Sequence, residues 1–240
     1  KQILDATKKI LDENPINISL SISLDGESET HNIIRKKQDA YPRAINTIKE
    51  LSKLSEKEKR ILVGVNSTYT GSNYQSIIQL YQELSSVKLD YVTLNLLRGV
   101  TWNSRPKGID INEYNHLSSL KEKLISPKKK ESSFFHSIMA SKGRLMTRII
   151  SDTFEKNCSV NTCYAGSLFG VIKDNGDVFA CEQLSSPIGN LTDVDFDLSS
   201  IWFSTAANEQ RCSIANHECH CTYECVSSCN IFFNSSFDKF

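Results

Sequence analysis

The chain has 240 residues, of which 39% are apolar, and its 28 basic residues balance 28 acidic ones. This content is enough to form a core, and the length allows one large domain or one domain with a small appendage. Because the formal net charge is zero, we expect neither nucleic acid nor an anionic membrane as a partner. No apolar run in the sequence is long enough to cross a bilayer.

The first hundred residues alternate between predicted helices and strands. In residues 16–24 apolar and polar side chains alternate strictly, which predicts a strand that ends at Asp25-Gly26. A charged linker follows, and two further strands are expected at 61–66 and 90–97. Apolar residues recur at helical spacing in three segments, about 3–11, 41–54 and 73–86. This order predicts an α/β fold in which helices pack outside a parallel sheet, with too few strands for a closed barrel but enough for part of one.

Two more helices are predicted beyond a loop at 102–108. The first spans about 112–124 and the second, a long one, about 132–156. Between them lies the basic run Lys128-Lys129-Lys130, which is flanked by acidic residues. We therefore interpret this run as a solvated turn and not as a phosphate site.

All eight cysteines lie at or after Cys158. Such crowding after a long cysteine-free stretch indicates either a metal site or a set of disulfides. The sequence shows no signal peptide, so we expect a reducing cytoplasm, where clustered cysteines more often bind metal.

Cys163 and Cys181 stand in a C-x12-G-x4-C pattern. Two short apolar segments between them, 168–172 and 178–180, are expected to form a β-hairpin whose turn contains Asn175-Gly176, because Asn-Gly supplies the positive φ angles of such turns. The hairpin would bring the two thiols close together. Thiolates from separate segments that converge on one point suit an iron-sulfur cluster or a structural zinc ion.

The cysteine-rich part carries five motifs: Cys163-Tyr164-Ala165-Gly166, the run from Asp174 to Cys181, Gly189-Asn190-Leu191, Ile201-Trp202, and Cys219-x-Cys221-x3-Cys225. Together they resemble the SPASM or twitch extension of radical S-adenosylmethionine (radical SAM) enzymes. The first half is also similar to the partial barrel of these enzymes in the run from Ser21 to Gly26, followed by His31 and Arg35, and in the run from Leu94 to Gly99.

The resemblance implies a partial (β/α) TIM-like barrel, truncated at its N-terminus, over 1–126, a connecting helix over 127–157, and a small SPASM/twitch domain over 158–240. It implies an oxidoreductase or maturase that cleaves S-adenosylmethionine and uses the 5'-deoxyadenosyl radical to modify a peptide or small-molecule substrate. A reductant such as flavodoxin or ferredoxin would supply electrons. Ser23, Asp25 and Arg35 would contact the cofactor, and Ser23 its ribose.

The chain departs from this family in lacking the C-x3-C-x2-C loop, whose thiolates hold the catalytic [4Fe-4S] cluster. We expect the chain to be the remainder of a larger enzyme and to be inactive alone. A degenerate homologue is the alternative.

A second departure concerns the auxiliary site. Asn216 stands where the full SPASM pattern has its first cysteine, and no cysteine follows Cys229. The resemblance therefore implies a single auxiliary [4Fe-4S] cluster with Cys163 and Cys181 as two ligands. Two more would come from Cys219, Cys221, Cys225 and Cys229; spacing does not decide between them, although Cys221 with Cys225 is preferred.

Two other hypotheses remain open at this stage. The same thiolates would also suit a non-catalytic zinc-binding interaction module. Disulfides in a secreted protein are a third option, which the missing signal peptide disfavours. Cys158 and Cys212 lie outside the matched motifs and are interpreted as ordinary thiols, and His217 and His220 as residues that do not ligate metal.

Overall fold

The computed structural model describes residues 2–98, 108–125, 133–217 and 219–233. Most of the expected loop at 102–108 and the lysine turn at 127–130 lie outside these residues. The chain forms two compact units: unit 1 contains Lys1–Leu97 and Pro106–Ser132, and unit 2 contains Arg98–Arg105 and Ser133–Phe240. Across these ranges, no helix combines the length and the apolar character that a membrane span requires.

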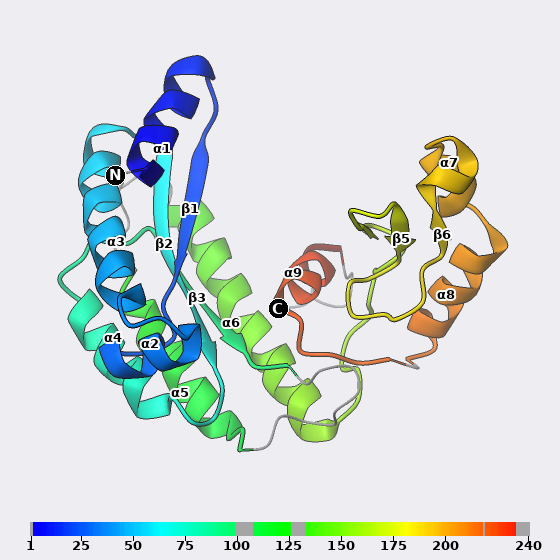
Figure 1. Cartoon of the computed structure of the whole chain (residues 1–240). Helices are drawn as coiled ribbons and strands as arrows, with labels where there is room; N and C mark the ends of the chain where they lie inside the picture. Colours follow the sequence, from blue (N-terminus) through cyan, green and yellow to red (C-terminus); the bar gives the residue numbers. More distant parts are fainter. Residues whose placement is uncertain (1, 99–107, 126–132, 218, 234–240) are drawn as a thin grey trace. The chain divides into compact units, whose positions relative to one another are not determined.

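Unit 1 is built on a parallel sheet with strand order β1-β2-β3. The strands are β1 (Ile18–Ser23), β2 (Ile61–Tyr69) and β3 (Tyr91–Leu96). All three lie where strands were predicted, and β2 extends three residues further. Because parallel crossovers are right-handed, sequential strand order places the connecting helices on one side of the sheet. Figure 1 shows α3 and α4 on the same side. Among the described residues the sheet stays open and does not close into a barrel.

The described residues of unit 1 form five helices: α1 (Gln2–Glu13), α2 (Ser28–Arg35), α3 (Ala40–Lys57), α4 (Tyr74–Leu84) and α5 (Ile111–Glu122). Four of them were predicted from apolar spacing. The prediction of a linker was wrong for α2, whose N-terminus is capped by the Glu27 carboxylate through the N–H groups of Glu29 and Thr30. Glutamate is an unusual capping residue, so no ordinary start signal marks this helix in the sequence.

The two faces of this sheet differ in polarity. On one face, Leu11 of α1 and Leu51 of α3 pack against Ile61 and Val63 in a buried cluster that the apolar residues of β1 adjoin. On the other face the strand register aligns mostly polar or small residues of all three strands, together with the exposed Leu62 opposite Ser19: Ser19, Ser21, Ser23, Leu62, Gly64, Asn66, Thr68, Tyr91, Thr93 and Asn95. We call this set the polar face; all its members except Gly64 remain at least partly exposed. Parallel sheets are normally apolar on both sides, so this face is unusual.

Unit 2 begins with the long helix α6 (Ser133–Lys156), which packs against α9 (Glu224–Phe233). Between them in the chain lies a small antiparallel sheet of β4 (Val171–Ile172), β5 (Asp177–Phe179) and β6 (Gly189–Asn190). The 3-10 helix η1 (Leu191–Val194), α7 (Leu198–Trp202) and α8 (Thr205–Ala215) follow. The predicted hairpin and the short helix at Trp202 are confirmed, whereas α8 and α9 were not predicted. A separate core fills this unit, formed by nine buried residues that include Ala165, Val178, Cys181, Ile201 and Val226.

Candidate functional site

The hairpin of unit 2 positions the first two candidate ligands. Gly176 adopts φ +88° and its N–H donates to the Lys173 carbonyl, while the Lys173 N–H donates to the Asp177 carbonyl. This is a three-residue hairpin loop with a left-handed residue at its end, which glycine favours. Cys181 follows β5 closely and is buried in the core, and Cys163 packs against the same core.

The closing cysteine run divides into two parts. Cys219 and Cys221 lie in a segment without regular secondary structure before α9, whereas Cys225 and Cys229 lie within that helix. None of the eight cysteines, all of which the structure describes, forms a disulfide. The hypothesis of a disulfide framework therefore has no support in this fold.

The electrostatics of the thiols indicate which cysteines are neighbours. The pKa of the Cys221 thiol is raised to about 11, chiefly by burial; a hydrogen bond with the Tyr223 backbone opposes this shift, and repulsion from Cys181, Cys163 and Cys219 contributes to it. Cys221 as a residue nevertheless remains exposed. Burial also raises the pKa of Cys181, and again Cys163 adds to the effect. Cys221 thus lies within electrostatic reach of Cys163, Cys181 and Cys219, and Cys181 lies within reach of Cys163; we call these four thiols the thiol group.

Cys225 has a different environment. It is exposed and hydrogen-bonds with the phenol of Tyr223, whose pKa is raised chiefly by burial and also by a hydrogen bond with Glu182. The ring of Tyr223 is covered by the guanidinium of Arg98, whose Cζ lies 4.1 Å from the ring centroid. Arg98, which belongs to unit 2, also forms an ion pair with Glu224 at 3.4 Å. A cation therefore lies beside the residues that follow Cys221.

Thiolates are suitable ligands both for an iron-sulfur cluster and for a zinc ion. In the described part of the chain, no three His, Cys, Asp or Glu side chains are arranged to hold one metal ion.

Cys158, Cys212 and His217 do not belong to the thiol group, whereas His220 stands between two of its members in the chain. Cys158 and Cys212 are exposed, and neither appears among the groups that shift the thiols. His217 lies just beyond α8 in a left-handed conformation, with φ +58°, and its N–H donates to the Ile214 carbonyl. This conformation is typical of the residues that terminate a helix.

In unit 1 the candidate residues after β1 hold one another in place. Asp25 is buried, and its two carboxylate oxygens accept from Arg35 Nη2 at 2.6 Å and from the Thr68 N–H at 3.1 Å. The Asp25 N–H donates to Nδ1 of the buried His31 at 3.1 Å, and Asn73 donates to the Asp25 carbonyl at 2.7 Å. Asp25 therefore organises the carboxyl end of β1.

Ser23 lies on the polar face at the end of β1, opposite Asn66 of β2. The Asn66 Oδ1 accepts from Asn95 Nδ2 at 3.0 Å, so these two amides meet across β2 and β3. Hydroxyl and amide groups of three strands are thus aligned near the carboxyl ends of the sheet, where α/β proteins bind ligands.

The sequence prediction preferred Cys221 with Cys225 as the second pair of ligands, and this choice stays a prediction. The thiols that raise the pKa of Cys221 are Cys181, Cys163 and Cys219. The start of α9 at Glu224 would have helped, because Cys225 and Cys229 at i and i+4 then share one helical face. The stacking of Arg98 on Tyr223 joins residues too far apart in the sequence for any local pattern to reveal it.

No protein-family model and no curated protein matches the chain.

Proposed function

We propose that this chain is part of a radical SAM oxidoreductase or maturase whose C-terminal unit holds an auxiliary [4Fe-4S] cluster. The observation that carries the proposal is the thiol group, in which Cys221 lies within electrostatic reach of Cys163, Cys181 and Cys219. The sequence motifs that resemble the twitch extension surround the same residues. Four soft donors are the set that such a cluster takes.

The thiol group supplies the four ligands in this proposal. Cys163 and Cys181 are the two ligands that the resemblance implied, and we propose Cys219 with Cys221 in place of Cys221 with Cys225. Cys225 is less suited because it hydrogen-bonds with Tyr223, and Cys229 lies one helical turn further along α9. When bound, the cluster would supply one-electron chemistry for the substrate or for the catalytic centre.

The chain's own residues would enclose and stabilise this centre. The cation of Arg98, held against Tyr223 and Glu224, would offset the negative charge that four thiolates bring to the site. The buried core around Cys181 would limit the access of water. Both effects are known to set the potential of iron-sulfur centres.

Unit 1 would contribute the cofactor side of a partial barrel. We propose that Ser23 on the polar face contacts S-adenosylmethionine directly, because its position is accessible and the neighbouring Asn66 and Asn95 are polar too. Asp25, with both carboxylate oxygens engaged, would act by fixing Arg35 and the end of β1. No cysteine precedes Cys158, so this unit supplies no thiolate to a catalytic cluster and the chain alone would be inactive.

The remaining parts of the proposal follow from the reaction class. The substrate would be a peptide or a small molecule, a flavodoxin or ferredoxin would provide electrons, and the reducing cytoplasm would keep the thiols available.

Anaerobic reconstitution tests the cluster assignment. The purified chain is incubated with iron and sulfide, and its metal content and electron paramagnetic resonance spectrum are recorded. We expect about four irons and four sulfides per chain, the content of one [4Fe-4S] cluster. Uptake of one zinc ion without iron or sulfide would contradict the proposal and favour a zinc-binding interaction module.

Single substitutions to alanine then test the ligand set. Replacing Cys181 or Cys219 should abolish the cluster signal, whereas replacing the exposed Cys212 should leave it intact. Cys225→Ala distinguishes the proposed ligand pair, Cys219 with Cys221, from the pair Cys221 with Cys225. If it abolishes the signal while Cys219→Ala retains it, the cluster assignment stands and the choice of Cys219 is wrong.

A further inference from the structure

A pocket of about 320 Å³ lies in unit 2 beside β4 and α7. Five consecutive residues, 168–172, line one side of it, and Leu198, Trp202 and Phe203 line the other. The pocket therefore follows the chain along strand β4. The absence of a side chain at Gly170 allows this close packing, because a Cβ atom there would be 2.7 Å from Cζ3 of Trp202.

Strand β4 is an edge strand of its sheet, whose order is β4-β5-β6. The Lys173 N–H bonds to the Asp177 carbonyl, so Lys173 and Asp177 form a hydrogen-bonded pair. In an antiparallel ladder such pairs alternate with non-bonded ones. The next pair, Ile172 with Val178, is therefore non-bonded, and the N–H and C=O groups of Ile172 point away from β5. A donor and an acceptor thus lie at an open edge.

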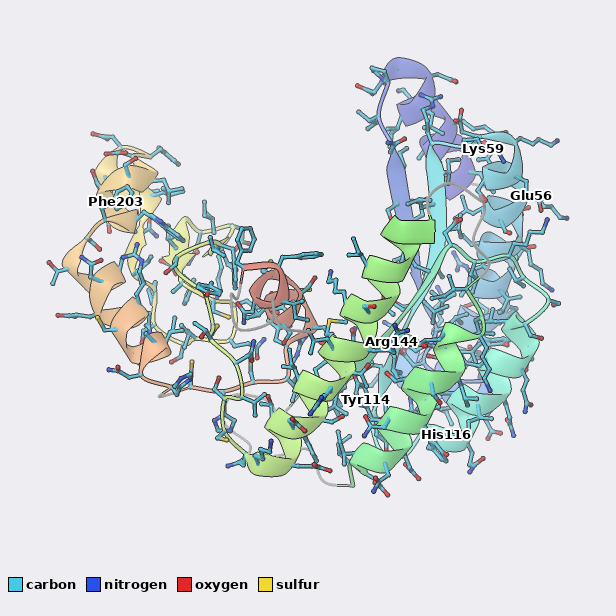
Figure 2. All side chains as sticks on the ribbon, turned by 180° about the vertical axis from the view of Figure 1, so that it is seen from behind. Glu56, Lys59, Tyr114, His116, Arg144 and Phe203 are labelled. Carbon is cyan, nitrogen blue, oxygen red and sulfur yellow. The ribbon has the colours of Figure 1, made fainter. Side chains whose placement is uncertain are left out.

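Large apolar side chains surround this edge and are exposed. Leu168 and Ile172 are each about half exposed, and Phe203 at the end of α7 (Figure 2) is 75% exposed, the highest value among the large hydrophobic residues that the structure describes. Clustered exposed apolar groups beside a pocket mark binding surfaces. An open strand edge with an adjacent apolar pocket is the combination that binds extended peptides by strand addition.

The charge of residues 168–203, which include the pocket, indicates the sign of the charge that a partner should carry. Residues 168–203 contain one lysine, five aspartates and one glutamate, a net charge of −5 in a chain whose total is zero. The single lysine, Lys173, lies over the ring of Phe179, with 4.0 Å between Nζ and the ring centroid. Complementary charge would steer a basic segment to this surface.

We propose that the β4 edge and the adjoining pocket bind an extended, basic segment of a partner polypeptide as an added strand. Its backbone pairs with Ile172, one apolar side chain enters the pocket next to Trp202 and Phe203, and flanking lysines or arginines meet the acidic surroundings. This binding needs no metal. It goes beyond the proposed cluster chemistry and can fail or succeed independently of it.

An immobilised library of octapeptides provides the probe. Each member has lysines at both ends and a random centre drawn from Val, Ile, Leu and Phe, and a matched library carries glutamates at the ends. The full chain should bind the lysine library preferentially, with binding that weakens as salt is raised. Binding to neither library, or better binding to the glutamate library, would overturn the proposal.

The strongest lysine peptide is then labelled, and its affinity for variants is measured by fluorescence anisotropy. Phe203→Ser should weaken binding about tenfold or more, the usual effect of removing a central aromatic anchor. Phe233→Ser is the matched control, because Phe233 is also exposed but lies on α9; it should bind normally. Equal loss in both variants would show that the pocket is not the binding surface.

The backbone contact has its own test. Ile172→Pro removes the outward N–H and should weaken binding, whereas Ile172→Val keeps that N–H and an apolar side chain and should not. N-methylation of the central peptide residue should have the same effect as the proline. Circular dichroism checks that each variant is folded. Sedimentation of the chain without peptide tests whether a second copy of the chain occupies this edge instead. A dimer that Phe203→Ser dissociates would assign the edge to a second copy and overturn the proposal.

Discussion

A Cβ atom at Gly64 would lie 2.3 Å from Cε2 of Tyr91, so the tyrosine ring occupies the space that any side chain at position 64 would need. The ring crosses β2 to reach β1, where Ser19 Oγ donates to the Tyr91 hydroxyl at 2.9 Å. One glycine therefore allows a hydrogen bond between the two outer strands of the polar face.

Gly64→Ala should destabilise unit 1 because the Tyr91 ring must move and the bond to Ser19 is lost. We expect a loss of about 1–3 kcal/mol in the free energy of unfolding, as for other overpacked sites, measured by urea denaturation. In the double variant with Tyr91→Ala the added cost of Gly64→Ala should largely disappear. A full cost in that background would show that the ring is not the obstacle.

Substitution by alanine at two glycines of unit 2 should change the free energy of unfolding in opposite directions. Gly176 has φ +88°, and a Cβ atom there would lie 2.9 Å from Asn190 Oδ1, so Gly176→Ala should cost about 1–2 kcal/mol. Gly143 lies within α6, and a Cβ atom added there would meet no heavy atom within 4 Å, so Gly143→Ala should add about 0.5–1 kcal/mol. Denaturation monitored in both variants checks this. If both changes have the same sign, the turn geometry does not control the hairpin.

Local sequence patterns predict the helices and strands of this fold only where apolar side chains are buried and polar side chains are exposed. The alternation in β1 predicted the strand because each apolar side chain packs under α1 and α3. The helix α2 was missed because its isoleucines, Ile33 and Ile34, are exposed while the polar His31 is buried, which reverses the usual amphipathic pattern. The thiol group could be predicted only as a set of alternatives, since spacing does not reveal which cysteines meet when a hairpin and a segment without regular secondary structure pack on one core.

The ion pair between Asp25 and Arg35 should contribute measurably to stability. Asp25 is buried, so the loss of Arg35 would leave its carboxylate charge less well neutralised. Because Arg35 is 42% exposed, solvent reduces the loss of stability. A double-mutant cycle with Asp25→Ala and Arg35→Ala should give a coupling of about 1–2 kcal/mol.

The exposed pair of Asp39 and Arg43, at 3.4 Å, provides the control for that cycle. Its coupling should be about 0.3–0.5 kcal/mol, as for other solvated pairs one helical turn apart. Equal couplings in the two cycles would mean that Asp25 has no special structural role, and a direct contact with a cofactor would then be its better explanation.

The stability of unit 1 should fall as the pH is lowered below about 6.5, the ordinary pKa of histidine. Burial lowers the pKa of His31; the Asp25 carboxylate opposes this effect and the Arg35 cation adds to it. His31 Nδ1 also accepts the Asp25 N–H, which requires the nitrogen to be unprotonated. Between the unfolded and the folded pKa, the unfolded chain therefore binds a proton that the folded chain does not.

Urea denaturation between pH 7.5 and pH 5.5, about one unit on either side of the ordinary histidine pKa, measures this effect. The slope from this residue is at most about 1.4 kcal/mol per pH unit below 6.5 and vanishes above it. His31→Asn places a non-titrating acceptor near the Asp25 N–H, so this variant should be less dependent on pH in that range. If its slope equals that of the parent chain, the proton responsible binds elsewhere and His31 is not the group that links folding of β1 and α2 to pH.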